Sequence, residues 1–385
     1  MRMPALLLVF ILGLSLALSS LPTSAQELPA RKKSKKKPKK EVPEITQTLE
    51  VAPDPPVAVT AETARLSFYN SPLSAKGLLS QQTRDAIKAI RTAAHGAQIV
   101  KIRAFVAGTG DLRRVASIVS EMLTEAKLPL PPVSTVLVGA LPLEGAQIAM
   151  EAAAVEKKAV NPEGLAFFSG QLVRATEEKA RPLMEVAGES LGNLEKAMAS
   201  AGVTADNVLR TTCFLSVLDN GHELQGRLAQ RFPKAVHNVL QLQRVTGPSA
   251  VECEAVGRLS AAPAAAVEFI NPAGLTASPA YTQFVRVKAG RLVFTTTQQS
   301  FGFDEPAMKL AMTRLQRMLE SQQAGFGQVV MASGYALSIR AMAEYRRVRS
   351  SFYNAAKPPA STLLTFEGLP SSDAIFGLDV VAAIE

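Results

Sequence analysis

The feature of this sequence that most constrains its fold is an order of strand and helix signals that returns three times. Residues 210–220, RTTCFLSVLDN, form a β-prone run that ends in Asp-Asn-Gly, and an amphipathic stretch with apolar residues four apart follows at once. Twice in each copy, the spacing of the apolar residues changes from that of a strand to that of a helix. The pattern predicts three copies of strand, helix, strand, helix, strand, strand, each roughly 95–120 residues long.

The expected elements follow this order with small differences between the copies. In the first copy we expect helices and strands at 80–95, 99–108, from 111, 134–141 and 146–155. In the second copy they fall at 165–172, 177–200, 208–217, 221–232, 236–245 and 250–259. The third copy begins with a hairpin at 281–299 that turns at Ala289 and Gly290. The later elements of this copy fall from 304, at 329–338, around 342–352, at 361–369 and at 375–384.

Each copy has two helices that need a sheet to cover, which predicts an α+β sandwich. Three like domains on one chain can pack around a pseudo-threefold axis, as three subunits would. The joints at 156–162 and 260–266 are short, as tight packing requires. We therefore expect repeat 1 at 65–158, without an N-terminal hairpin, repeat 2 at 159–260 and repeat 3 at 267–385.

The N-terminal residues have the composition of a secretory signal peptide. Arg2 supplies a positive charge, residues 6–18 are apolar, and Thr-Ser-Ala at 23–25 offers a cleavage site. We expect a signal peptide at 1–25 and a secreted or periplasmic protein, with an uncleaved membrane anchor as the alternative. Residues 26–64 are Lys-rich and then Pro-rich, a composition that cannot bury a core and predicts a disordered linker.

The net charge of +9 comes almost entirely from one short segment. Eight of the 42 basic residues lie in RKKSKKKPKK at 31–40. We expect this run to be a solvated tether or to contact anionic envelope surfaces. The rest of the chain is nearly neutral and shows neither a basic stripe nor stacking aromatics, so no nucleic acid is expected on the folded part.

The cysteine and histidine residues form no metal-ligand pattern. Cys213 and Cys253 lie in expected strands among apolar neighbours, and we expect two buried thiols, with a cross-strand disulfide as the alternative. The three histidines, His95, His222 and His237, are widely spaced.

Several stretches of the second and third copies resemble one known family. In the second copy these are AFFSGQ (166–171), GVTADNVLRTTCFLSVLDN (202–220) and VECEAVGRL (251–259). In the third copy they are SPAYTQFVRVKAGRLVFTT (278–296) and PASTLLTFEGLP (359–370). They resemble the RidA family, also called YjgF or reactive-intermediate deaminases. PPVSTVLVGALP (131–142) extends the resemblance to the first copy, although no opening hairpin precedes FYNSPLS there.

The resemblance implies three chorismate-mutase-like sandwich domains arranged as an intramolecular pseudo-trimer, with clefts between the domains. Members of the family hydrolyse 2-iminoacids and enamines to ketoacids and ammonia without a metal or an organic cofactor. A monomer acting as a pseudo-trimer on a small-molecule substrate is the corresponding expectation for this chain.

The positions of the family's functional residues are only partly retained. The family's arginine, at the start of the penultimate strand, corresponds to Val133, His237 and Ser361 in the three copies. An arginine binds a carboxylate through two parallel hydrogen bonds, and none of these three side chains can replace that interaction.

The family's glutamate corresponds to Glu254 in the second copy and, with an offset of one residue, to Glu151 and Asp379 in the others. The family's tyrosine corresponds to Tyr281. We therefore expect Glu254 and His237 to be the catalytic residues, and we expect substrate contacts from Tyr281, Ser361, Asp379 and Glu151.

Each of these assignments has a structural alternative. His237 can instead be a hydrogen-bonded interface residue. Glu254 shares a strand face with Glu252, and either acid can line a cleft or face solvent. Two functions therefore remain open. One is a divergent imine or enamine deaminase, a hydrolase with a degenerate site between repeats. The other is a non-catalytic pseudo-trimer that binds a small ligand or an envelope partner.

Overall fold

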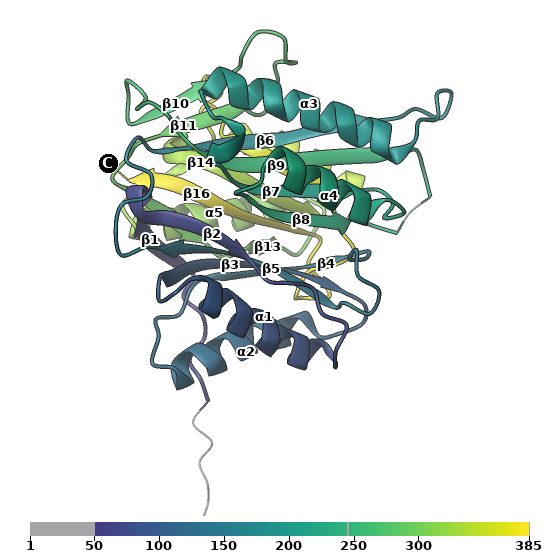
Figure 1. Ribbon diagram of the computed structural model, residues 1–385. Coiled ribbons are helices and arrows are strands. Elements are labelled where there is room, and N and C mark those ends of the chain that lie inside the picture. Colours follow the sequence, from purple (N-terminus) through teal and green to yellow (C-terminus); the bar gives the residue numbers. More distant parts are fainter. Residues whose placement is uncertain (1–50, 245, 385) are drawn as a thin grey trace, which may run out of the picture. The chain divides into compact units, whose positions relative to one another are not determined.

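The computed structural model describes residues 51–244 and 246–384, so the expected signal peptide and Lys-rich run lie outside the described residues. Within the described residues the chain forms three β-sheets, and two α-helices accompany each sheet (Figure 1). We call the three groups of elements modules 1, 2 and 3.

The modules follow one another along the chain. Module 1 consists of β2 (Leu66–Asn70), α1 (Leu79–Ala93), β3 (Gln98–Ala107), α2 (Leu112–Glu125), β4 (Val133–Val138) and β5 (Ile148–Val155). Module 2 consists of β6 (Leu165–Arg174), α3 (Leu183–Ala201), β7 (Val208–Leu215), α4 (Gly221–Arg231), β8 (Val236–Gln241) and β9 (Ala250–Arg258). Module 3 consists of β12 (Arg291–Thr295), β13 (Gln298–Ser300), α5 (Glu305–Ser321), β14 (Val329–Ala336), α6 (Ile339–Arg349), β15 (Ala360–Thr365) and β16 (Phe376–Ile384).

The strand order is the same in the three sheets. It runs β2-β5-β3-β4 in module 1, β6-β9-β7-β8 in module 2 and β12-β16-β14-β15 in module 3. We call β3, β7 and β14 the middle strands of their modules. Each is parallel to the penultimate strand (β4, β8 or β15) and antiparallel to the last one (β5, β9 or β16). The pairing with the last strand shifts register at matching places, between Ile99 and Lys101, Val208 and Arg210, and Val329 and Met331. The three strands thus share a bulge at the same point of their ladders.

The helices form where the sequence provides caps and an apolar stripe. The Asp111 side chain accepts a hydrogen bond from the Arg113 amide at the start of α2, and Asp304 accepts one from the Ala307 amide at the start of α5. Helix α1 begins at Leu79 without a side-chain cap. The buried faces of the helices cover one face of their sheet and give each module its own apolar core.

The hairpin expected at 281–299 does not form, because its two arms belong to different sheets. Strand β11 (Phe284–Val287) pairs with β6 of module 2, and β10 (Val267–Ile270) pairs with β11. Strand β12 instead pairs with β16 of module 3. Buried and exposed side chains alternate in the same way whether the two arms pair with each other or with strands of different sheets. Buried side chains of both arms meet in one apolar cluster between the sheets. The edge of module 2 is thus completed by residues that the sequence assigned to repeat 3.

A second strand crosses between modules in the same way. Strand β1 (Ala58–Glu62) precedes module 1 and pairs antiparallel with β12 of module 3. The linker expected at 26–64 therefore ends earlier than its Pro-rich composition indicated. The five residues AVTAE are too short to stand out from that composition, and the exposed edge of β12 orders them by pairing.

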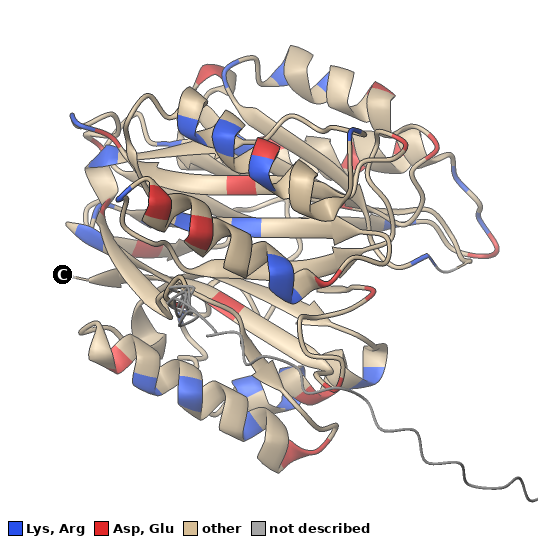
Figure 2. Cartoon of the chain, turned by 90° about the horizontal axis from the view of Figure 1, so that it is seen from below, with Lys and Arg blue, Asp and Glu red and all other residues tan. Residues whose placement is uncertain are grey.

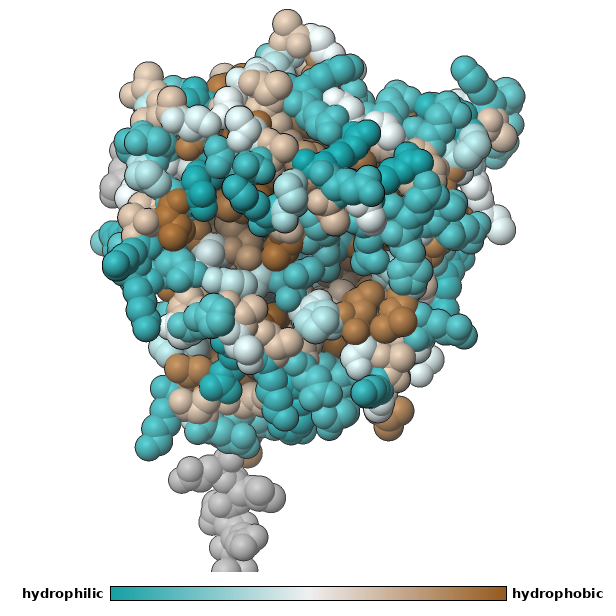
Figure 3. Space-filling model, in the orientation of Figure 1, coloured by the Kyte–Doolittle hydropathy of each residue, from teal (hydrophilic) through white to brown (hydrophobic). Residues whose placement is uncertain are grey.

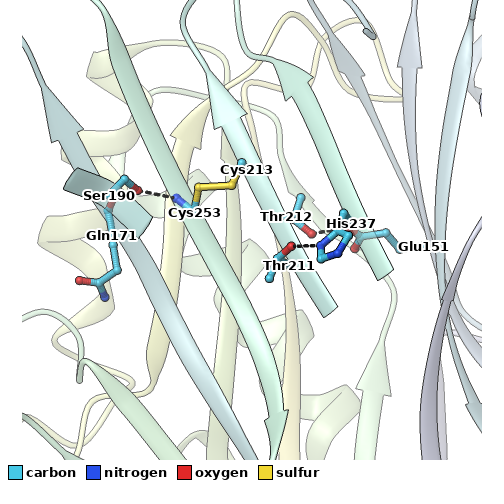
Figure 4. The surroundings of a disulfide bond; sticks show 8 residues. All are labelled: Glu151, Gln171, Ser190, Thr211, Thr212, Cys213, His237 and Cys253. Carbon is cyan, nitrogen blue, oxygen red and sulfur yellow. Dashed lines mark hydrogen bonds between the residues drawn. A yellow bond between two sulfur atoms is a disulfide. The ribbon is translucent and has the colours of Figure 1, made fainter. Parts of the chain in front are cut away.

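The two cysteines are joined, contrary to the expected pair of buried thiols. Cys213 on β7 and Cys253 on β9 lie directly opposite each other in the antiparallel ladder, with Cα atoms 4.1 Å apart, and they form a disulfide (Figure 4). The Cys253 amide donates to Ser190 on α3 at 3.2 Å. Sequence alone did not reveal the register that brings the two sulfur atoms together.

The surface of the described part is largely polar and carries charges of both signs. Basic and acidic residues are interspersed along the helices seen from below in Figure 2. The face in Figure 3 is mainly hydrophilic, with separate hydrophobic patches. None of the helices among the described residues is long and apolar enough to cross a membrane.

Candidate functional site

Three acidic residues occupy matching positions in the three modules. Each lies on the last strand of its sheet, opposite a residue of the middle strand that follows the bulge, in the pairs Glu151–Arg103, Glu254–Thr212 and Asp379–Ser333. These are the three acids that the sequence placed in the site. All three are buried, so their partners decide what they can do.

Glu254 and Glu151 belong to one ion-pair network between modules 1 and 2. The Arg103 guanidinium on β3 donates to Glu254 at 2.6 Å and to Glu151 at 2.7 and 2.9 Å. Arg210 on β7 reaches the same two carboxylates at 3.0 and 3.3 Å. Asn238 and Thr212 also donate to Glu151. Both acids are thereby held as paired carboxylates between two arginines.

The network keeps Glu151 ionised. Burial alone would raise the pKa of Glu151, but the charges of Arg103 and Arg210 and the hydrogen bonds from Thr212 and Asn238 outweigh it, and the pKa falls to about 2. A carboxylate this tightly paired is a poor proton donor or acceptor near neutral pH. The arrangement joins two modules, and it does not bring Glu151 or Glu254 to Tyr281.

Asp379 forms a comparable contact between modules 1 and 3. Lys101 on β3 donates to Asp379 at 3.3 Å, to the Ser134 hydroxyl at 2.6 Å and to the Thr295 carbonyl at 2.6 Å. The Tyr335 hydroxyl also donates to Asp379, at 3.2 Å. Burial lowers the pKa of Lys101, and the charge of Asp379 opposes that effect. Asp379 is thus engaged with module 1.

His237 and Glu254 do not share a cleft, because they point to opposite faces of the module 2 sheet. His237 pairs with Thr211 and Glu254 pairs with Thr212, and neighbouring residues of a strand face opposite ways. The His237 ring lies 2.7 Å from the Thr211 hydroxyl and 3.1 Å from the Phe232 carbonyl, so both ring nitrogens are occupied (Figure 4). Burial lowers the pKa of His237, which favours the neutral ring. The two residues of the expected catalytic pair therefore do not lie at one site.

Tyr281 and Ser361, by contrast, come together. They line a cavity of about 230 Å³ between modules 2 and 3, which we call the 2/3 cleft. The Ser361 amide on β15 donates to the Ser169 hydroxyl on β6 at 2.8 Å, and Thr282 donates to the Pro358 carbonyl at 2.5 Å. These bonds hold the loop that carries Tyr281 against the start of β15. The complete lining is Gly170, Leu172, Glu252, Ser278, Ala280, Tyr281, Arg346, Arg349, Ser361 and Leu363.

The acid of the 2/3 cleft is Glu252, two residues before the expected Glu254. Its side chain is buried, and both burial and the nearby charge of Glu254 raise its pKa to about 8, with Arg346 and Arg174 acting in the opposite direction. Glu252 is therefore mostly protonated at neutral pH and can donate a proton. Gly170 makes room for it, because a Cβ at that position would lie 1.8 Å from Glu252 Oε1.

Tyr281 complements this acid. Burial, and then the neighbouring Glu252, raise the pKa of Tyr281, so its phenol stays neutral over the physiological range. A neutral phenol can both donate and accept a hydrogen bond. The cleft thus holds two neutral hydrogen-bonding acids side by side with the Ser361 hydroxyl.

Two arginines of α6 also line the 2/3 cleft and were not expected from the sequence. Arg349 is 5% exposed and lies over the rings of Tyr345 and Tyr353, at 5.4 and 5.1 Å. Arg346 lies three residues earlier on the same helix, at the exposed side of the cleft. They supply positive charge from a helix, whereas the family's arginine position is at the start of β15, where this chain has Ser361.

The matching interfaces lack this arrangement. The position of Glu252, opposite Phe214, corresponds to Ala149 opposite Phe105 in module 1 and to Gly377 opposite Tyr335 in module 3. Isolated bridges close the loops of the other two interfaces, between Ala140 and Gln241 and between Leu137 and Gly368. Among the described residues, the interface between modules 2 and 3 is therefore the one that combines the buried Glu252 with Tyr281 and Ser361.

A larger hollow of about 470 Å³ lies at the C-terminal ends of α1 and α2. Its charged lining residues are Lys88 and Arg91, and the other side chains are mostly apolar or small. Without an acid beside these cations it offers no proton transfer, so we assign the site to the 2/3 cleft, despite its smaller volume. No group of three potential metal ligands occurs among residues 51–244 and 246–384.

Comparison with solved structures gives similarity over about one third of the chain. No family model matches the chain, and no curated protein matches it. YyfB from Yersinia pestis, a protein of unknown function of the Rid family, is 19% identical over 31% of this chain and 100% of its own, with a TM-score of 0.29. Rv2704 from Mycobacterium tuberculosis, a member of the YjgF/YER057c/UK114 family, is 18% identical over 31% of this chain and 99% of its own, with a TM-score of 0.23. Each of these two solved structures is similar to about one third of this chain.

Proposed function

We propose that the chain is a divergent RidA-type protein whose three modules form an intramolecular pseudo-trimer with one working site, the 2/3 cleft. The common strand order and the bulge at the same point of each middle strand support descent from one repeated unit. The strands β1 and β11, which complete the sheets of other modules, support a single cooperative body.

We infer that the cleft hydrolyses a small imine or enamine. One observation carries this proposal: a buried carboxyl group that is protonated at neutral pH, Glu252, faces a cavity of about 230 Å³ beside the neutral phenol of Tyr281. Catalytic acids are commonly carboxyl groups whose pKa is raised by burial. Glu254 is instead held by Arg103 and Arg210, and both ring nitrogens of His237 already have hydrogen-bond partners.

In the proposed reaction Glu252 gives its proton to the imine nitrogen, or to the carbon of an enamine, and becomes a carboxylate. Water then adds to the iminium carbon and transfers a proton back to Glu252. The resulting carbinolamine loses ammonia as its hydroxyl proton moves to nitrogen, which leaves a ketone. One imine and one water thus yield one ketone and one ammonia, and Tyr281 and Ser361 provide hydrogen bonds that orient the reacting group.

The test is ammonia release from 2-iminobutanoate generated in the assay by an amino-acid oxidase, compared between the wild type and Glu252→Gln. Loss of a general acid is expected to reduce the rate about 10²- to 10⁴-fold. Asp373→Asn, which changes an exposed carboxylate outside the cleft, serves as the control. A wild-type rate equal to that of buffer, with an active family member run in parallel, would reject the hydrolase.

The second candidate is a non-catalytic ligand-binding protein. The replacement of the family's arginine by Val133, His237 and Ser361 favours it, because the family's means of holding its substrate is absent from β4, β8 and β15. In that case small ligands stabilise the protein in a thermal-shift screen, Glu252→Gln retains this stabilisation, and no ammonia forms.

The location and partners are part of the proposal. We propose a secreted or periplasmic protein that acts as a monomer, with the Lys-rich run at 31–40 facing anionic envelope surfaces. The Cys213–Cys253 disulfide supports an oxidising compartment, since cytosolic disulfides are rare.

A further inference from the structure

The larger hollow at the C-terminal ends of α1 and α2, which we call the module 1 hollow, takes no part in the proposed reaction. The two helices lie side by side (Figure 1), and the hollow at their ends has a volume of about 470 Å³. Small-molecule sites commonly have volumes of about 300–1,000 Å³. The lining includes the buried side chains of Ile99 and Leu123 and the 42% exposed side chain of Leu128. Contact with these side chains favours a ligand that carries an apolar group.

Two cations of the module 1 hollow have no acidic partner. Lys88 and Arg91 lie three residues apart on α1, so they share one side of that helix. Neither forms an ion pair with any residue in 51–244 or 246–384, and no acid is among the lining residues. The other three arginines of the two helices do have acidic partners: Arg84 and Arg114 pair with Glu121, and Arg113 pairs with Asp111. The basic residues of α1 and α2 that lack such partners are thus the two at the hollow.

A third cation lies at the edge of the module 1 hollow. The backbone of Gly96 has a φ of +86°, and a Cβ added there would lie 3.9 Å from Lys157 Nζ. Lys157 is exposed and forms no ion pair within the described part of the chain. Glu125, the last residue of α2, is exposed and is not among the lining residues. The hollow therefore combines an apolar wall with positive charge at its edge.

The helix dipole accounts for only part of this charge. The partial negative charge at the C-terminus of a helix favours a cation in the last turn, and Arg91 occupies the last turn of α1. Lys88 lies before the last turn, where the effect is small. Helix α2 ends without a basic residue in its last turn. Lys88 therefore gains little from the dipole, and its charge is available to a ligand.

We propose that the module 1 hollow is a second ligand site, which binds a phosphate monoester that carries an apolar group. The apolar group contacts Leu123 and Leu128, and the phosphate lies at Lys88 and Arg91. A phosphate monoester has a charge of about −1.5 to −2 at pH 7, which matches two unpaired cations, and both lysine and arginine bind phosphate. A carboxylate would leave one of the two charges unmatched. The site is separate from the 2/3 cleft and does not depend on the proposed reaction.

The experiment is calorimetric titration of the full chain with octyl phosphate, octanoate, octanol and inorganic phosphate, below the concentrations at which the amphiphiles form micelles. We expect octyl phosphate to bind at least about 10-fold more tightly than each of the others, because it alone satisfies both charges and the apolar wall. In the double variant Lys88→Met/Arg91→Met the affinity for octyl phosphate should fall at least about 10-fold. Added salt should weaken binding to the wild type, because these charges are close to solvent.

Two further variants control for indirect effects. Arg113→Met removes an exposed arginine that pairs with Asp111 at the other end of α2, and it should bind octyl phosphate as the wild type does. Ala97→Phe fills the hollow without changing its charge and should also lower the affinity at least about 10-fold. Thermal unfolding of each variant shows whether it is folded.

Several results would overturn the inference: equal affinity for octyl phosphate and for octanoate or octanol, unchanged affinity in the double variant, or no binding of octyl phosphate at millimolar concentration. A free phosphate ester and a membrane lipid offer the same chemistry, and co-sedimentation with vesicles of phosphatidylcholine and phosphatidic acid separates these sources. Co-sedimentation that is lost in the double variant identifies a lipid. Binding of octyl phosphate without co-sedimentation identifies a soluble ligand.

Discussion

The protonated Glu252 makes a quantitative prediction about how stability depends on pH. The pKa of Glu252 is about 8 in the folded protein, against an ordinary value of 4.5. Between these two values the folded state holds a proton that the unfolded state has released. The free energy of unfolding contributed by this residue therefore decreases as the pH rises from about 4.5 to about 8, and it is constant outside that range.

One proton of difference corresponds to about 1.4 kcal/mol per pH unit, so the whole interval is worth at most about 5 kcal/mol. Glu252→Gln cannot ionise and lacks this dependence. The variant should gain stability relative to the wild type by about 1.4 kcal/mol for each pH unit between 5 and 8. Any cost of the substitution that is independent of pH only shifts the whole curve.

The measurement is urea denaturation at pH 5, 6, 7, 8 and 9 for the wild type, Glu252→Gln and the exposed control Asp373→Asn. The wild type and Asp373→Asn should run in parallel, and the Glu252→Gln curve should diverge from both up to about pH 8. Parallel curves for the wild type and Glu252→Gln would show that Glu252 is an ordinary ionised carboxylate, and the proposed proton donor would be refuted.

Three further substitutions test the disulfide, the ion-pair network between modules 1 and 2, and the cleft. Changing Cys213 and Cys253 together to alanine opens a loop of 40 residues and should lower the free energy of unfolding by about 4 kcal/mol, seen as a lower urea midpoint; an unchanged midpoint would argue against the disulfide. Arg103→Met removes one of the two arginines that the buried Glu151 and Glu254 share and should destabilise the protein by about 3–5 kcal/mol in the same assay; a loss below 1 kcal/mol would contradict the network. Gly170→Ala places a methyl group against the Glu252 carboxyl and should lower ammonia release at least about 10-fold; a normal rate would mean that this carboxyl is not the acid.

The repeated order of elements could be predicted because each element has its own period. Long helices such as α3 and α5 and the buried strands β7 and β14 lie close to their expected ranges. Strand partners could not be predicted, because alternation tells which face of a strand is buried and not which strand lies beside it. For this reason β1 and β11 were assigned to a linker and to a hairpin, whereas they complete the sheets of modules 3 and 2.

Residues of the candidate site could be predicted only where a sequence motif marks their position. Tyr281 and Ser361 were identified from motifs, and the structure brings them into one cleft. Glu252 and Glu254 share a strand face, so alternation could not separate them. The Ser-Gly-Gln stretch at 169–171 was the available signal, because its glycine leaves space for the carboxyl of Glu252.

The arginines of α6 had no such signal. Their role depends on where the helix packs against β15, which no local pattern contains. The partner of Glu254 is likewise Arg103, which lies 151 residues away in another module.

The central claim is that one of three related interfaces is a working site, and the stoichiometry of ligand binding tests it most directly. A calorimetric titration of the full chain with 2-oxobutanoate should give one site per chain in the wild type. Three equivalent sites, or one site that persists with unchanged affinity in the Gly170→Ala variant, which fills the space beside Glu252, would contradict the assignment to the 2/3 cleft.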